Sequence, residues 1–136
     1  MMTAISDQRS AIRASAPPGR VAKSYRELQV WQRSIQLSVA LYRLTDSFPR
    51  QEIYGLTNQL RRAGVSVASN IAEGYGRASK GEYRNFIGMA RGSALEIQTQ
   101  LVIARELGFG DPRVISGAEQ LAEETGKMLW AMMQKL

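Results

Sequence analysis

Apolar side chains recur every three or four positions along most of this 136-residue chain, a spacing typical of helices rather than strands. The first such stretch runs from Ser24 to about Asp46. The tetrapeptide Ser24-Tyr25-Arg26-Glu27 at its start has the pattern of a capping box, which predicts a helix beginning there. Its expected apolar stripe is Leu28, Trp31, Ile35 and Tyr42, flanked by Val30, Leu37, Leu41 and Leu44.

Two further helices are predicted between residues 49 and 107. Phe48-Pro49 ends the first helix, and Pro49 suits the first turn of the second, which should end near Gly74. A second capping box, Ser79-Lys80-Gly81-Glu82, opens the third helix. The expected seam of the second helix is Ile53, Leu56, Leu60, Val67 and Ile71, and that of the third is Tyr83, Phe86, Ala90, Ala94, Ile97, Leu101 and Ala104.

A fourth helix completes the pattern. Gly108-Phe109-Gly110 should end the third helix, and Asp111-Pro112 supplies an N-cap and a first-turn proline for the next. The seam of this last helix is Ile115, Ala118, Ala122, Thr125, Leu129, Met132 and Leu136. Four helices joined by short loops predict an all-α protein, an antiparallel up-and-down four-helix bundle over residues 24–136.

Residues 1–23 lack any apolar period and contain Pro17-Pro18-Gly19, which cannot lie inside a helix. They hold four basic residues and one acidic residue, so we expect a disordered, flexible basic tail. The segment has no continuous apolar stretch of the kind found in signal peptides, and no run of 18 apolar residues occurs in the chain. We therefore expect no membrane contact and a cytoplasmic location.

The chain has no cysteine and no histidine. Disulfides and thiolate metal sites are therefore excluded, and so are the commonest metal ligand and general base. A catalytic interpretation would need Glu73 and Glu96 to converge on a metal, yet di-metal bundles use Glu-x-x-His pairs that this chain cannot form. We expect no catalytic residue, no metal and no cofactor.

A second, polar stripe runs beside the apolar seam of the second helix and should be partly buried. If the second and third helices fold back near residues 75–79, Arg62 comes level with Ser93 and about one turn from Glu96, which suggests an ion pair between Arg62 and Glu96. Small residues at 63, 64 and 66 are expected to face others at 88, 92 and 93. The predicted structural polar network is Gln59, Arg62, Ser66, Asn70, Glu73, Ser93 and Glu96.

The net charge of +6 is uneven: residues 24–91 hold ten basic and five acidic residues, while residues 92–136 hold four and six. Lys80, Arg84 and Arg91 share one helical face, with Arg77 just ahead of them. Such a face could bind phosphates of RNA or DNA without reading bases, although a solvated surface is an equally ordinary explanation. The proposed nucleic-acid contact set is Arg61, Arg77, Lys80, Arg84 and Arg91.

An apolar patch offers a different class of function. Exposed Tyr54, Tyr75, Phe109, Trp130 or the methionines could be covered by a second copy of the chain or by another protein. The alternative to nucleic-acid binding is therefore a protein-interaction adaptor or scaffold that docks a partner enzyme.

Several short motifs together resemble a known family. They are Leu28-Gln29-Val30-Trp31, Phe48-Pro49 with Glu52, Gln59-Leu60-Arg61-Arg62-Ala63, Ser69-Asn70-Ile71-Ala72-Glu73-Gly74, and Gly92-Ser93 with Glu96. From about Tyr25 to Asp111 the chain resembles the four-helix-bundle proteins of 23S rRNA intervening sequences, the S23 ribosomal protein family. It is similar also to the accessory variability determinant of diversity-generating retroelements. The resemblance implies a ring-like homo-oligomer, with a pentamer favoured, and a possible reverse transcriptase partner, but no enzyme activity.

Overall fold

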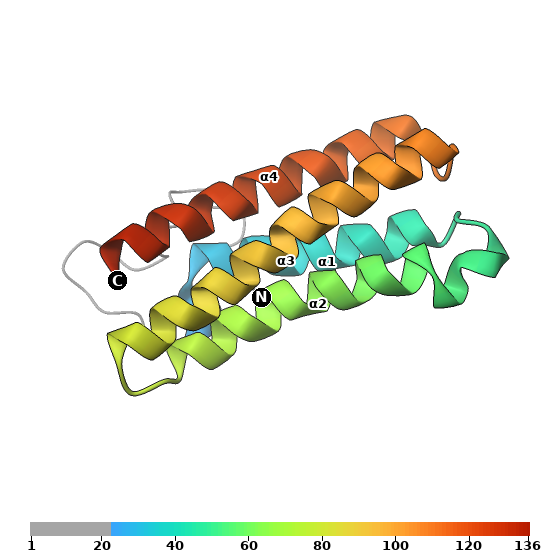
Figure 1. Cartoon of the computed structure of the whole chain (residues 1–136). Coiled ribbons are helices and arrows are strands. Elements are labelled where there is room, and N and C mark those ends of the chain that lie inside the picture. The colour runs from blue at the N-terminus through green and yellow to red at the C-terminus, as the bar shows by residue number, and fades with distance from the viewer. Residues whose placement is uncertain (1–22) are drawn as a thin grey trace.

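The computed structural model describes residues 23–136, so the predicted tail lies outside the described residues except for Lys23. Two short 3-10 helices, η2 and η3, accompany four long helices, and the described residues contain no strand (Figure 1). The elements are η2 Tyr25–Glu27, α1 Gln29–Thr45, η3 Arg50–Tyr54, α2 Leu56–Tyr75, α3 Lys80–Leu107 and α4 Pro112–Lys135.

The helices form the predicted up-and-down bundle. Each helix packs against the next one along the chain, and α4 also packs against α1, which closes the bundle. Figure 1 shows that the α2–α3 turn, the start of α1 and the end of α4 lie at one end of the molecule. The α1–α2 and α3–α4 connections lie at the other end.

The core is aliphatic. Burying a side chain of this size contributes about 1.5–3 kcal/mol relative to leaving it exposed, so these residues supply the main driving force for folding. The largest side chains with almost no exposure are Leu37, Leu41, Leu60, Ile71, Ile87, Ile97, Leu101, Ile115 and Leu129.

Helix α1 differs from the prediction at its start and in its buried face. Ser24 caps the short η2 turn, where its hydroxyl accepts a hydrogen bond from the Arg26 amide at 3.1 Å, and α1 itself begins only at Gln29. The flanking apolar set is buried, and so is Leu28 of the predicted stripe, whereas Tyr42 of that stripe is 43% exposed. Helix α1 carries apolar residues on two faces, and a helical period alone does not say which face meets the core.

Helix α2 also begins later than predicted. Pro49 precedes the η3 turn instead of opening the helix, and α2 starts at Leu56, whose amide donates to the Glu52 carboxylate at 3.0 Å. Ile53 therefore lies in η3, where it is 50% exposed, and the prediction that it belongs to the seam was wrong.

The remaining helix boundaries follow the predicted caps. The Glu82 amide donates to the Ser79 hydroxyl at 3.1 Å, which confirms the N-cap of α3. Gly108 ends α3 in the left-handed region at φ 77°, and Asp111 caps α4 by accepting from the Arg113 amide at 2.9 Å. The predicted seam of α3 omitted Ile87, which is fully buried.

Candidate nucleic-acid interface

Four of the five predicted phosphate-binding residues lie on or just before α3. Arg77 follows α2, Lys80 and Arg84 lie in the first turns of α3, and Arg91 lies farther along the same helix. We call these four residues the basic cluster. Within residues 23–136 none of the four forms an ion pair, in contrast to Arg105, which pairs with Glu119 at 2.7 Å. The cluster therefore keeps its positive charge unneutralised by carboxylates of the described chain.

Each arginine of the basic cluster is held by a single contact that does not cancel its charge. The guanidinium of Arg77 lies over the ring of Phe86, 4.6 Å from the centroid, and that of Arg91 lies over the ring of Trp130 at 4.8 Å. Arg84 donates from Nε to the carbonyl of Met133 in the last turn of α4 at 3.2 Å. A guanidinium stacked on a ring keeps its N–H edge available for a phosphate, so these contacts orient the groups and leave donors free.

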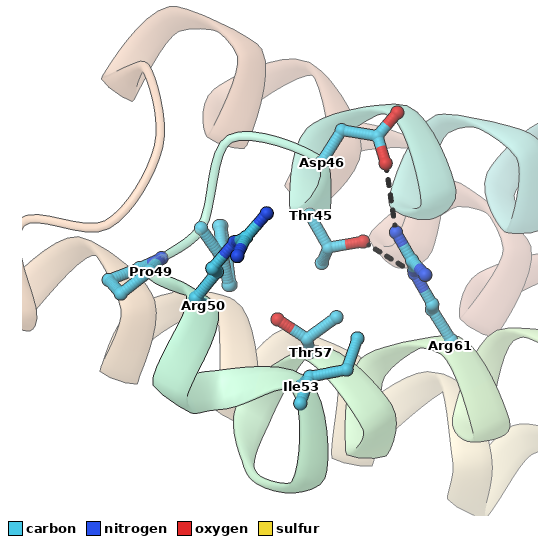
Figure 2. Close-up of a pocket in the computed structure, with 8 residues that line it drawn as sticks. Thr45, Asp46, Pro49, Arg50, Ile53, Thr57 and Arg61 are labelled. Carbon is cyan, nitrogen blue, oxygen red and sulfur yellow. Dashed lines mark hydrogen bonds and ion pairs between the residues drawn. The ribbon is translucent and has the colours of Figure 1, made fainter.

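The structure separates Arg61 from the basic cluster. With a rise of about 1.5 Å per residue, Arg61 lies about 20 Å along α2 from the end that leads to Arg77. Its side chain donates to the hydroxyl of Thr45 at 2.8 Å and to the carboxylate of Asp46 at 3.1 Å, as Figure 2 shows. These bonds tie α2 to the end of α1, and Asp46 neutralises the charge.

The pocket beside Arg61 has a volume of about 410 Å³. Thr57 is 3% exposed, and within residues 23–136 its side chain makes no hydrogen bond. Figure 2 shows Pro49 and Arg50 on one side of the site and Asp46 and Arg61 on the other. The Arg61–Asp46 pair is close to neutral, so Arg50 is the one lining charge without an ion-pair partner among the described residues.

The predicted polar network is only partly assembled. The hydroxyls of Ser66 and Ser93 lie 3.0 Å apart, and the amide of Asn70 donates to the Ser66 hydroxyl at 3.0 Å. Gln59 accepts from the amide of Gln100 at 3.3 Å. Four residues of the network are exposed, namely Gln59, Arg62, Glu73 and Glu96.

The hypothesis of an Arg62–Glu96 ion pair was wrong. Both residues line a surface pocket of about 370 Å³, but neither forms an ion pair with any described residue. The Ser66–Ser93 contact shows that the register between α2 and α3 is about one turn away from the predicted one, because Ser93 lies opposite Ser66 instead of Arg62.

Small residues of α2 and α3 were expected to face each other, but the glycines at 64, 88 and 92 do not. A Cβ on Gly64 would lie 3.4 Å from the backbone of Ser38 in α1, and one on Gly88 would approach Met133 of α4 at 3.5 Å. A Cβ on Gly92 would have no neighbour within 4 Å. The residue that does need to be small at the α2–α3 contact is Gly74, where a Cβ would lie 2.7 Å from that of Phe86.

A second surface pocket, of about 260 Å³, lies between α3 and α4 beside Arg91 and Trp130. The sequence indicates that Trp130 lies off the core seam of α4. Its contact with Arg91 depends on how α3 and α4 pack. For that reason the sequence pattern could not predict which residues of the two helices line this pocket together. The lining residues are Arg91, Leu95, Gln98, Glu123, Gly126, Lys127 and Trp130.

The described residues do not assemble a metal site. No three carboxylates come close enough together to hold an ion in the part of the chain that the structure covers. Glu73 and Glu96 are both exposed, and neither forms an ion pair with a described residue. Among the helices described, none is both long enough and apolar enough to cross a membrane.

Comparison with known proteins bears on the fold and on the family. The model of a family described as 23S rRNA-intervening sequence protein matches residues 26–131. No curated protein sequence matches the chain.

A crystal structure at 1.70 Å resolution has a similar fold. It is that of a protein of unknown function from the S23 ribosomal protein family of Bacteroides thetaiotaomicron VPI-5482. The two chains are 19% identical, with a TM-score of 0.70, and the match covers 77% of this chain and 98% of the other.

Proposed function

Because this chain belongs to the family of 23S rRNA-intervening sequence proteins, we propose that it is a non-enzymatic, homo-oligomeric bundle that binds structured RNA or other nucleic acid through the basic cluster. The family description names the intervening sequence of 23S rRNA and no ligand, so the support for nucleic acid comes from the charge of the basic cluster. Lys80 stands in the first turn of α3, where the helix dipole adds to the positive potential.

The absence of carboxylate partners for the basic cluster within residues 23–136 is the observation that carries this proposal. An unpaired guanidinium offers a planar set of donors that matches a phosphate, and binding releases counterions from the nucleic acid. Such contacts fix position on the backbone but read no base, so we expect weak sequence preference.

The test is binding of labelled hairpin RNA and duplex DNA to nuclease-treated protein at low and moderate salt. We expect affinity to fall steeply with salt concentration. A variant with Arg77, Lys80, Arg84 and Arg91 changed to Gln should bind more weakly to every sequence, and its salt dependence should be shallower by up to about 0.9 in logarithmic slope per lost phosphate contact.

A matched variant controls for net charge alone. Arg43, Arg50, Arg62 and Arg113 are exposed and lie outside the basic cluster, so changing all four to Gln removes the same charge from other places. This control should bind nucleic acid nearly as well as the wild type does. Equal weakening of both variants would mean that only net charge matters and would overturn the assignment to the cluster.

Self-association is supported by the outward apolar residues of α1 and α2. Val39 and Tyr42 are 42% and 43% exposed, and Val65 of α2 is 45% exposed. Because Gly64 packs against Ser38, Val65 and Val39 lie at about the same level of the bundle. A second copy of the chain would remove these apolar surfaces from water.

Light scattering tests the oligomer, for which a pentamer is the specific expectation. Val39→Glu should lower the measured mass, whereas Val114→Glu, at a site on α4 that is 46% exposed, should not. If the wild-type protein binds no nucleic acid even at low salt, the alternative is favoured: an adaptor that docks a partner enzyme such as a reverse transcriptase.

A further inference from the structure

We propose that the pocket between α3 and α4 holds one unpaired base of the bound nucleic acid, stacked against the indole of Trp130. This inference rests on the proposed function, because the basic cluster must first bring the nucleic-acid backbone to this face. It adds a preference for strands with unstacked bases over continuous duplex.

The walls of the pocket suit an aromatic ring. Trp130 is 49% exposed and Leu95, across the groove on α3, is 45% exposed. The volume of about 260 Å³ is that of a shallow recess between two helices and not of an enclosed cavity. A large exposed indole beside an exposed leucine leaves apolar surface in water, and a flat base would cover it.

The floor of the recess is open because α4 has a glycine there. Gly126 is buried, and a Cβ at this position would meet only Gln98 Nε2 at 3.6 Å and Ala94 Cβ at 3.9 Å. Both distances are ordinary contacts, so packing does not require a glycine at this position. Gly126 lines the recess together with Trp130 and Leu95, and without a side chain it narrows the recess less than any other residue would.

Polar groups at the edge of the recess match those of a base. The Gln98 amide makes no hydrogen bond within residues 23–136 and offers both a donor and an acceptor. Lys127 and Glu123 also line the pocket, where they pair with each other at 3.6 Å. That pair is exposed and therefore weak, so either group is available to an incoming ligand.

The recess is continuous with the basic cluster. Arg91 covers one face of Trp130, and Arg84 reaches Met133, which lies one turn farther along α4. A strand bound to Arg84 and Arg91 through its phosphates would therefore pass the mouth of the recess. Base pairs inside a duplex cannot enter it, because a base must leave its stack to meet an aromatic side chain face to face.

Tryptophan fluorescence provides the test, since the chain has only two tryptophans. In the full-length Trp31→Phe protein Trp130 is the only tryptophan, so emission excited at the red edge of the absorption band, where tyrosine does not absorb, comes from it alone. We expect an RNA hairpin with a single-stranded loop to quench this emission, and a blunt RNA duplex of equal length to bind with little quenching. The Trp130→Phe protein, which retains only Trp31, should show no quenching with either RNA.

Affinity gives a second measurement. Trp130→Leu should weaken binding of the loop RNA by on the order of tenfold, the usual effect of losing one base stack. It should weaken duplex binding less, because with a duplex only the contact that orients Arg91 is lost. Hairpin binding without quenching of Trp130 would contradict the proposal that this pocket holds a base, but it would not contradict the proposed function. If neither RNA binds the Trp31→Phe protein or the wild-type protein, the proposed function and the base-binding pocket are both contradicted. The quenching result holds even if Trp130→Leu fails to fold.

Discussion

Gly74 of α2 and Phe86 of α3 approach each other so closely that a Cβ on Gly74 would lie 2.7 Å from the Phe86 Cβ. Gly74→Ala must therefore push the two helices apart near their turn. We expect it to lower the free energy of unfolding by about 1–3 kcal/mol, the usual effect of overpacking. Gly92→Ala is the control, because a Cβ there has open space, and it should stabilise the helix by up to about 1 kcal/mol. Equal effects in chemical denaturation would contradict this contact.

Arg61 should prove to be a structural residue. Its guanidinium donates to Thr45 and Asp46 and lies over the ring of Tyr42, 4.6 Å from the centroid. Arg61→Met should destabilise the protein by about 1–3 kcal/mol while leaving affinity for RNA unchanged. Lys80→Met should weaken RNA binding and leave the stability of the protein unchanged. Loss of RNA binding in Arg61→Met, at a temperature where the variant is folded, would return Arg61 to the binding surface.

Tyr83 makes the bundle sensitive to alkali. Burial raises the pKa of its phenol to about 12, and the nearby Tyr75 adds to the effect. Because the pKa in the folded state is above the ordinary value of 10, the folded protein holds this proton more tightly. This contribution to stability is complete below about pH 10 and is lost as the pH rises toward 12.

Phenolate absorbance during a pH titration measures this effect. The Tyr83→Phe protein should lack the phenol whose pKa is raised to about 12 and should lose less stability between pH 10 and 12. An unaltered titration curve in Tyr83→Phe would show that another tyrosine is responsible.

Arg62 and Glu96 should each be replaceable. Both are exposed, and within residues 23–136 neither has an ion-pair partner. Arg62→Met and Glu96→Gln should each change the free energy of unfolding by less than about 0.5 kcal/mol. A loss of several kcal/mol in either thermal melt would indicate that the two residues interact in solution after all.

The N-cap residue of α3, Ser79, should contribute to the stability of the protein although its side chain is exposed. Ser79→Ala removes the acceptor for the Glu82 amide and is expected to cost about 1 kcal/mol. Ser69→Ala, at an exposed position inside α2, is the control and should be neutral or slightly stabilising because alanine favours helix. Urea denaturation of the two variants compares them directly.

Local chemistry explains which boundaries could be predicted from the sequence. The caps at Ser79, Gly108 and Asp111 depend on residues within the same turn, so their motifs locate the ends of α3 and the start of α4. Pro49 is as compatible with a 3-10 turn as with an α-helix. The N-cap of α2 is Gly55, and the Glu52 carboxylate accepts from the first amide of the helix.

The buried face of a helix and the alignment of two helices along their lengths were harder to predict, because both depend on contacts between helices. Helix α1 has apolar residues on two faces, so Tyr42 could be assigned to the core from its spacing alone, although it lies on the surface. The register between α2 and α3 depends on the geometry of residues 76–79, which is why Ser66, and not Arg62, meets Ser93. A shift of one turn was enough to remove the expected ion pair.

In the basic cluster, too, the local arrangement could be predicted from the sequence and the contacts between helices could not. Spacing along one helix predicted that Lys80, Arg84 and Arg91 share a face. The contacts that hold the arginines involve Met133 and Trp130 of α4, about 40 to 50 positions away in the chain. No local pattern links residues so distant in sequence, so only the packing of α3 on α4 shows which aromatic ring Arg91 covers.

The packing of α4 against α1 gives the bundle a cyclic order. The start of α1 and the end of α4 lie at the same end of the molecule, so a short glycine-serine linker could connect them. New chain ends could then be opened between Gly108 and Gly110, in the left-handed turn that separates α3 from α4. Such a circular permutant would keep every helix contact while changing which helix leaves the ribosome first, and so the order of folding during synthesis could be varied without changing the folded bundle.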